Sequence, residues 1–405
     1  MGDTPTSPPA RKFPVAYLIY RMKHSAREKL LYICDWLPPD YGAVGQYSVM
    51  FARQLAEEGR EVTLLGLSSR GASESVEMVG NGQLRIVKLA AASVDKSSQL
   101  RRMLWTAVIN TRLLWFVCRR FRDVNTVLFT GSPPLLIHWL GPLNVLLRRR
   151  LIYRITDFHP ECAIAQRGSA NLALRLLLRL TIFWRRRVDA FEVLGEDQAE
   201  RLRVIGIDDS RIALKRDPSP VQIGPGTLPL PRPTNLGPEQ LLLLYSGNWG
   251  VAHDYQTFIA GYAKHHRVGT GRFILWLNAV GAAVESIVDA LTRQELPFIR
   301  GTPVPLHQLA SLLVTPDAHL ITLSDAFVGY VLPSKVHGCI SSQRPILFVG
   351  SEKSDVHLLC RERARARYER VDVGDTEGCW RALERLAQEI NEQRTSPVRK
   401  KNGEQ

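Results

Sequence analysis

The sequence predicts an α/β protein made of two Rossmann-like, doubly wound domains, and three observations support this prediction. The chain has 405 residues, which is too many for one ordinary hydrophobic core. Short apolar runs alternate with amphipathic helical patterns in both halves, which is typical of parallel sheets covered by helices. Residues 217–240 are rich in proline and glycine and indicate a linker between the halves.

In the first half, a buried strand at 30–35, a helix at 47–58 and a strand at 61–66 form a βαβ unit with a right-handed crossover. The strands expected next lie at 84–89, 126–130, 151–155 and 190–194, and the helices at 97–122, 135–147, 171–187 and 196–205. This order predicts a first domain over residues 13–216, preceded by a disordered tail at 1–12.

The alternation restarts after the linker and predicts a second domain over residues 241–375. Its expected strands lie at 241–246, 272–277, 318–322 and 345–349, and its expected helices at 253–265, 284–291, 306–314 and 335–341. A last helix at 376–391 is expected to lie near the domain boundary, and residues 392–405 form a polar tail.

The charge of the chain points to an anionic partner. The 53 Lys and Arg residues outnumber the 39 Asp and Glu residues and leave a net charge of +14. No recognised RNA or DNA module accompanies this charge, so nucleic acid is not an expected partner. The six cysteines show no metal-binding spacing, and no DxD triplet occurs, so we expect no metal site and no cofactor.

Residues 127–147 are uncharged and long enough to cross a bilayer, but their glycines and prolines would break a spanning helix. Two other segments, 99–122 and 171–187, combine apolar residues with arginines. Each fits a helix packed in the core or a helix lying on an anionic membrane. We therefore expect a cytoplasmic protein that associates with the inner face of the cell membrane.

Two glycine-containing turns follow expected strands, where doubly wound sheets bind ligands. In PPDYGAVGQ, Gly42 and Gly45 would let backbone N–H groups approach a phosphate, although a purely structural turn fits equally well. The spacing is not GxGxxG, which argues against the usual dinucleotide site. The second turn, YSGNWG, contains Gly247 and Asn248.

A third segment, DAFVGYVLPSKVHGCISSQR, places Ser334 before a helical pattern as an expected N-cap. Lys335 follows at the helix start, where the helix dipole disfavours a cation. An anion site explains this lysine better than an idle surface position does.

In this order, the three segments resemble the family-four-like glycosyltransferases with the GT-B fold, over roughly residues 29–349. The resemblance implies transfer of a sugar from a nucleotide sugar without a structural metal, with the acceptor on the first domain and the donor on the second. It assigns the donor phosphates and nucleotide to Gly42, Gly45, Gly247, Asn248, Asp325, Leu332, Pro333, Ser334 and Lys335. We expect the acceptor to be lipid-linked or otherwise membrane-associated.

The sequence departs from this family at two places. The family commonly has two glutamates eight apart in the third segment, where this chain has Asp325 and Gly338. It also has a basic pair after the first donor-domain loop, where this chain offers only His253. Two alternatives therefore stay open: a nucleotide-sugar epimerase of similar fold, and a non-catalytic protein that binds sugar nucleotides.

The acceptor-side candidates are Asp157, His159 and Glu161 in YRITDFHPE, at the end of an expected strand. They could position an acceptor hydroxyl, take its proton or stabilise positive charge on the sugar. A helix cap and a satisfied polar histidine are the structural alternatives. The clustering of three ionisable groups at a strand end favours the functional interpretation.

Overall fold

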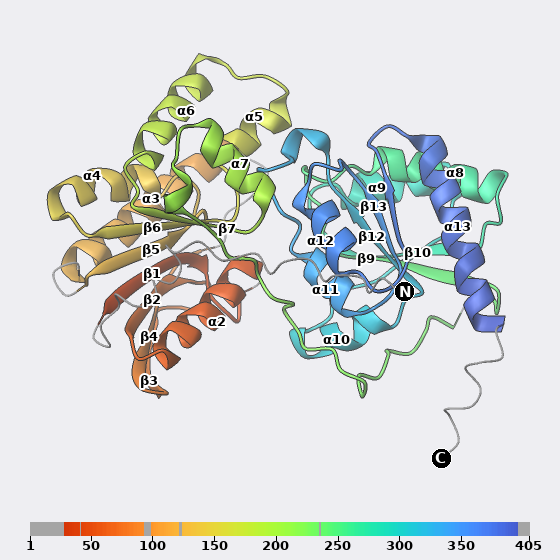
Figure 1. Ribbon diagram of the computed structural model, residues 1–405, viewed down its shortest axis with the longest axis horizontal. Helices are drawn as coiled ribbons and strands as arrows, with labels where there is room; N and C mark the ends of the chain where they lie inside the picture. The colour runs from red at the N-terminus through yellow and green to blue at the C-terminus, as the bar shows by residue number, and fades with distance from the viewer. Residues whose placement is uncertain (1–27, 41, 93–98, 121–123, 235, 396–405) are drawn as a thin grey trace, which may run out of the picture. The chain divides into compact units, whose positions relative to one another are not determined.

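The computed structural model describes residues 28–40, 42–92, 99–120, 124–234 and 236–395. The chain divides into two compact units, which are described separately (Figure 1). The first contains the described residues up to Arg154, together with Trp184–Glu192 and Gly206–Ala213. The second contains Ile155–Phe183, Val193–Ile205 and the residues from Leu214 onward.

An eight-stranded sheet runs through the first half of the chain in the order β3-β4-β2-β1-β5-β6-β7-β8. Its strands are β1 (Lys29–Trp36), β2 (Glu61–Ser68), β3 (Ser73–Val79), β4 (Gly82–Ala90), β5 (Thr126–Thr130), β6 (Arg150–Ile155), β7 (Ala190–Val193) and β8 (Ile212–Leu214). β1 pairs in parallel with β2 on one side and with β5 on the other, so the strand order reverses direction between β1 and β5.

The helices of this half are α2 (Ala43–Glu57), α3 (Gln99–Arg120), α4 (Ile137–Leu147), α5 (Glu161–Arg167), α6 (Leu172–Arg185) and α7 (Glu196–Val204), with a short 3-10 helix at Asp209–Arg211. α2 packs on β1, and Tyr32, Phe51 and Leu55 belong to one buried core cluster. The expected helix at 47–58 begins earlier, at Ala43. Residues 97–98 and 121–122 of the expected helix at 97–122 lie outside the described residues.

The second unit contains a six-stranded, fully parallel sheet in the order β11-β10-β9-β12-β13-β14. Its strands are β9 (Leu241–Asn248), β10 (Phe273–Val280), β11 (Phe298–Arg300), β12 (Ala318–Thr322), β13 (Ile346–Val349) and β14 (Tyr368–Val371). From the centre of the sheet, β9, β10 and β11 follow one another toward one edge, and β12, β13 and β14 follow one another toward the other edge. This is the Rossmann strand order.

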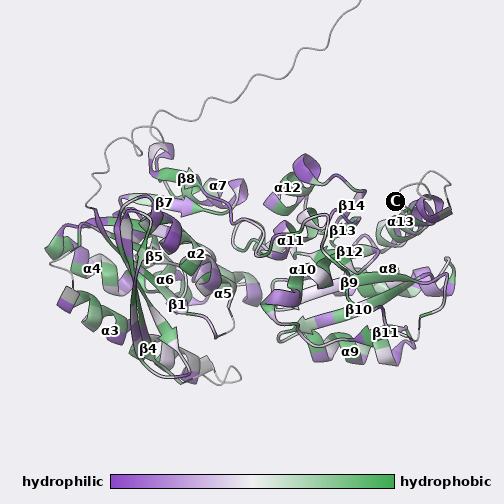
Figure 2. Ribbon diagram, turned by 90° about the horizontal axis from the view of Figure 1, so that it is seen from below, coloured by the Kyte–Doolittle hydropathy of each residue, from purple (hydrophilic) through white to green (hydrophobic). Residues whose placement is uncertain are grey.

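Helices cover both faces of this sheet because successive strand residues are apolar on both sides. Leu320 and Leu347 belong to one core cluster, whereas their neighbours Ile321 and Ile346 belong to another. Two other strands of the sheet, β9 and β10, also carry hydrophobic colouring in Figure 2. The helices are α8 (Gln256–Arg267), α9 (Val284–Arg293), α10 (Leu306–Val314), α11 (Lys335–Ser341), α12 (Asp355–Arg363) and α13 (Thr376–Thr395), with a 3-10 helix at Asp325–Phe327.

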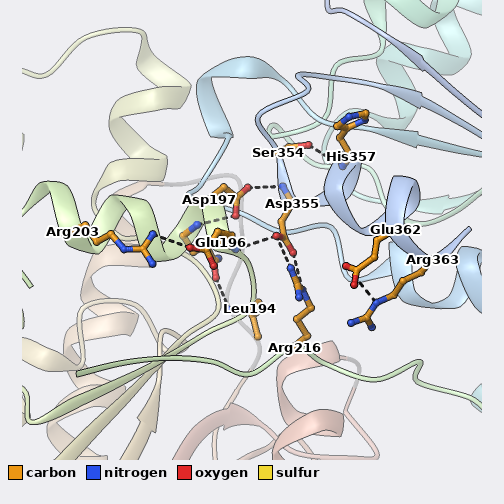
Figure 3. A network of polar contacts seen from close by, with 11 residues as sticks. Leu194, Glu196, Asp197, Arg203, Arg216, Ser354, Asp355, His357, Glu362 and Arg363 are labelled. Atoms are coloured by element: carbon orange, nitrogen blue, oxygen red, sulfur yellow. Dashed lines mark hydrogen bonds and ion pairs between the residues drawn. The ribbon is translucent and has the colours of Figure 1, made fainter. Parts of the chain in front are cut away.

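A network of carboxylates joins α7 and α12 within the second unit (Figure 3). Asp197 Oδ2 accepts a hydrogen bond from the Asp355 amide, and Asp355 Oδ1 accepts one from the Glu196 amide, each at 3.0 Å. Arg216 holds Asp355 in a bidentate ion pair, with N···O distances of 3.0 and 2.9 Å. Burial, assisted by the charge of Asp355, raises the pKa of Asp197 to about 6. A carboxylate at the start of each helix therefore accepts a hydrogen bond from the first backbone amide of the other helix.

Candidate functional site

The carboxyl ends of β9, β10 and β12 border a pocket of about 410 Å³ in the second unit. The pocket is lined by loop residues that follow these strands and by two residues of α5: Ala165, Gln166, Gly250, Val251, His253, Tyr255, Ala282, Ala283, Ser324, Ala326 and Phe327. In a doubly wound sheet this edge is where ligands bind. The pocket therefore marks the region in which a donor site is expected.

The amino group of Lys335, the first residue of α11, is buried near this edge without an ion-pair partner. Its Nζ is buried, has no hydrogen-bond partner among the described residues and lies 3.3 Å from the centre of the Tyr245 ring. Burial lowers the pKa of Lys335 from 10.5 to about 7. A buried ammonium without an ion-pair partner is costly, so an anionic ligand here would be strongly favoured.

Gly247 lies beside this lysine and needs to be glycine. Its φ is +111°, a conformation that side-chain-bearing residues rarely adopt, and a Cβ there would lie 3.8 Å from Lys335 Cε. The structure thus brings together two residues that are 88 positions apart (335 minus 247) and were both assigned to the donor. Asn248, the last residue of β9, is exposed.

Sequence reasoning missed Tyr245, which lies under the Lys335 ammonium. The Tyr245 ring stacks on Trp249 with centroids 3.6 Å apart, and its hydroxyl donates to the Asn248 carbonyl at 3.1 Å. The electron-rich face of an aromatic ring attracts a cation, which partly offsets the cost of burying Lys335. The continuous apolar run of β9 predicts that Tyr245 is buried, but it does not reveal which lysine would reach the ring.

His253 does not replace the basic pair of the resembling family. Its Nδ1 lies 2.6 Å from the Thr322 carbonyl oxygen, so Nδ1 carries the hydrogen and donates it. Burial, and then the charge of Lys335, lower the pKa of His253 to about 3. The imidazole is therefore neutral at physiological pH, with Nε2 as an acceptor. It can receive a hydrogen bond from a ligand hydroxyl but adds no positive charge for a phosphate.

The segment before Lys335 is buried in part, and two of its backbone carbonyls already accept hydrogen bonds within the protein. Leu332 and Pro333 are buried, and the carbonyls of Pro333 and Ser334 accept hydrogen bonds from Val336 and His337. Ser334 occupies the N-cap position, but its side chain makes no capping hydrogen bond, so the expected cap is wrong. Its backbone is already helical, with φ −58° and ψ −21°, whereas a capping serine has an extended backbone.

The other candidate donor residues have different surroundings. Asp325 is exposed, and burial together with the charges of Asp372 and Asp254 raises its pKa. Gly45 lies inside α2, and a Cβ there would come within 1.8 Å of the Trp36 carbonyl oxygen, so packing alone requires glycine. Gly42 precedes α2 with open space around its Cα.

The structure brings the acceptor candidates next to the Lys335 segment. Asp157 forms an antiparallel bridge with Val331, and the Phe158 amide donates to the Tyr330 carbonyl at 3.0 Å. His159 is half-buried, and Glu161 is buried at the first position of α5. Because Val331 is four residues before Lys335 in the chain, the two predicted segments are neighbours within the second unit.

Two features are absent from the described part of the chain. No group of three or more His, Cys, Asp or Glu side chains there is placed to hold a metal ion. None of the described helices is both long and apolar enough to cross a membrane.

No family model and no curated protein matches this chain. Solved structures do. A structure described as trehalose-6-phosphate from E. coli bound with UDP-2-fluoro glucose has a TM-score of 0.60 at 11% identity, over 90% of this chain and 93% of that one. WaaG, a glycosyltransferase involved in lipopolysaccharide biosynthesis, has a TM-score of 0.54 at 13% identity, over 91% and 96%.

A third similar structure is a protein assigned as a UDP-N-acetylglucosamine 2-epimerase from Listeria monocytogenes. It has a TM-score of 0.52 at 10% identity, over 89% of this chain and 88% of that one. At these identities the likeness concerns the fold. The chain has the GT-B fold, with two Rossmann-like α/β units, as the sequence predicted.

Proposed function

We propose that this protein transfers a sugar from a nucleotide diphosphate sugar to a hydroxyl of a lipid-linked or membrane-associated acceptor, without a metal ion. The observation that carries the proposal is the buried, unpartnered ammonium of Lys335 at the ligand-binding edge of a Rossmann-ordered sheet. A diphosphate would supply the missing counter-charge. Within the second unit, Gly247, Asn248, Asp325, Leu332, Pro333 and Ser334 complete the proposed donor site.

In this reaction the bond between the sugar's anomeric carbon and the diphosphate oxygen breaks, and its electron pair leaves with the diphosphate. Lys335 stabilises that negative charge. The acceptor oxygen bonds to the anomeric carbon and loses its proton. His159 orients the acceptor hydroxyl. Asp157 or Glu161 takes the proton if the reaction inverts configuration.

A panel of UDP-, GDP-, ADP- and TDP-sugars tests the proposal by thermal stabilisation. A true donor at about one hundred times its dissociation constant should add ~2.7 kcal/mol to the free energy of unfolding. Product analysis with the stabilising donor then separates three functions. Glycosylated acceptor supports the transferase, an isomerised donor supports the epimerase, and binding without product supports the non-catalytic protein. No stabilisation by any member would contradict all three.

Replacing His159 by alanine tests the acceptor side. We expect turnover with acceptor to fall by about 10²-fold or more, since a positioned proton-transfer or orienting group contributes roughly this factor. Binding of the donor nucleotide should stay within about threefold of wild type. His307→Ala, on the exposed start of α10, is the matched control. Normal turnover in His159→Ala would exclude the proposed role.

An exposed apolar stripe on α6 supports membrane association. Leu172, Leu176, Leu180 and Phe183 recur at helical spacing and are all exposed, with Arg175 and Arg179 exposed beside them. Large apolar side chains next to arginines fit a helix lying on anionic lipid.

We expect the protein to cosediment with vesicles containing phosphatidylglycerol but not with phosphatidylcholine vesicles, and to be released as salt rises. Changing both Leu176 and Leu180 to aspartate should abolish binding. Leu306→Asp, an exposed leucine on α10, should leave it intact. Equal binding to neutral vesicles, or no binding to either kind, would contradict the association.

A further inference from the structure

The first sheet has its own ligand-binding position, between β1 and β5. In the sheet, β1 lies between β2, the next strand in the chain, and β5, a later strand that pairs with its other edge. In open α/β sheets, ligands bind beyond the carboxyl ends of the two strands at such a reversal point. In the first unit those ends carry Asp35, in β1, and Ser132, two residues after β5.

Asp35 and Ser132 form a polar pair at this point. Ser132 Oγ donates a hydrogen bond to Asp35 Oδ2 at 2.5 Å. The other carboxylate oxygen, Oδ1, is buried without a hydrogen-bond partner among the described residues. Burial raises the pKa of Asp35 and outweighs the hydrogen bond from the Ser132 hydroxyl, which favours the charged form. A purely structural aspartate would have both oxygens satisfied.

The hydrogen bond fixes where the Ser132 hydroxyl points. Because its hydrogen is directed at Asp35, the lone pairs of Ser132 Oγ are the part that a ligand can meet. The loop backbone is also held, since Thr130 Oγ1 donates to the Ser132 carbonyl at 2.5 Å. The hydroxyl oxygen is thus a preorganised acceptor for a hydrogen bond from a ligand hydroxyl.

An apolar surface begins at the residue after Asp35. Trp36 stacks on Trp105 of α3 with ring centroids 5.9 Å apart and an interplanar angle of 17°. On the same helix, Leu104 and Val108 are 59% and 57% exposed, one turn apart. The first unit thus has an apolar surface on α3 and Trp36, and Trp36 follows the polar Asp35 in the chain, which fits a ligand with a hydroxyl-bearing head and an apolar tail.

We propose that Ser132 receives the acceptor's hydroxyl, that Asp35 is the positioning residue for Ser132, and that the Trp36–Trp105 pair and α3 bind the acceptor's apolar portion. This inference rests on the proposed sugar transfer and specifies its acceptor as an amphiphile. The polar residues that it names, Asp35 and Ser132, both lie in the first unit.

Octyl β-glucoside below its micelle concentration is the test probe, with methyl β-glucoside as the tail-less comparison. Binding to the full chain is measured by ligand-detected NMR, and binding of UDP, GDP, ADP and TDP is measured on the same samples. We expect wild type to bind the octyl compound at least tenfold more tightly than the methyl compound. Ser132→Ala and Asp35→Ala should each weaken octyl glucoside binding about fivefold, as for loss of one hydrogen bond of ~1 kcal/mol.

Conservative variants separate positioning from a structural role. Ser132→Thr keeps the hydroxyl and Asp35→Asn keeps an oxygen acceptor, so both should bind within about twofold of wild type. The double alanine variant should be no weaker than either single one, because the two residues act as one unit.

Wild-type affinity in Ser132→Ala, or equal affinity for the two glucosides, would overturn this inference. So would a loss of nucleotide binding in Asp35→Ala as large as its loss of glucoside binding. If wild type binds none of UDP, GDP, ADP and TDP, the proposed sugar transfer fails instead, whatever the glucosides do.

Discussion

Replacing Lys335 by methionine is expected to stabilise the ligand-free protein and at the same time weaken its binding of nucleoside diphosphates. Methionine keeps the length and apolar contacts of the side chain but removes a buried charge that has no ion-pair partner. Such a replacement should raise the free energy of unfolding by about 1–3 kcal/mol. Loss of a charge-assisted contact to phosphate should raise Kd for UDP or GDP by about 10- to 100-fold.

The two effects have separate controls. Binding of the bare nucleoside should change by less than about threefold, because Lys335 is proposed to contact only phosphate. Lys264→Met is the matched variant, since Lys264 also lies over an aromatic ring, that of Trp380, but is already paired with Glu377. It should leave nucleotide binding unchanged. Equal losses for nucleoside and diphosphate in Lys335→Met would assign Lys335 a packing role.

The pH dependence of stability provides a third measurement of the same variant. The pKa of Lys335 is about 7 in the folded protein and 10.5 as the ordinary value, so between these limits the unfolded chain binds the extra proton. The contribution of Lys335 to the free energy of unfolding therefore becomes more favourable as pH rises from about 7 to about 10. Relative to Lys335→Met, wild type should gain stability over this interval in chemical denaturation.

Replacing Arg216 by methionine is expected to give the largest loss of stability. Asp355 is fully buried, and Arg216 is its bidentate partner, so the variant leaves an uncompensated carboxylate in the interior. Breaking a buried ion pair in this way costs about 3–5 kcal/mol. Denaturant unfolding monitored by intrinsic fluorescence measures the change.

Arg232→Met is the matched control for this variant. Arg232 pairs with Asp317, which is also largely buried, but Arg394 contacts the same carboxylate and the Leu242 amide donates to it. The control should lose less than about 1 kcal/mol, because Asp317 keeps a charged partner. If both variants lost the same amount, the Arg216–Asp355 pair would be an ordinary surface ion pair in its effect.

The sequence predicted those elements whose burial produces a clear apolar pattern. β5, β12 and α11 lie at the expected positions because most of their apolar residues are buried. β3 was missed because its residues, SESVEMV, are mostly polar and exposed at the sheet edge. α12 was missed because DVHLLCRER carries four charged residues among nine and its first amide is satisfied by a carboxylate far away in the sequence.

The site was predictable only in part, for a similar reason. The glycine turn and the LPSK segment suggested that Gly247 and Lys335 serve one ligand, and the structure places them side by side. The ring beneath Lys335 and the neutral state of His253 depend on contacts between segments far apart in the sequence. Local patterns cannot contain that information. The roles of Asp157, His159 and Glu161 stay predictions.

The mutual capping of α7 and α12 has a consequence for biosynthesis. The Glu196 amide finds its acceptor 159 residues later, at Asp355. During translation, the start of α7 therefore leaves the ribosome long before the carboxylate that satisfies it has been made. A nascent or truncated chain ending within residues 217–240 would have Arg216 and Asp197 but no Asp355. Residues 193–205 would then be the weak point for proteolysis, and their protection would report that translation has passed residue 355.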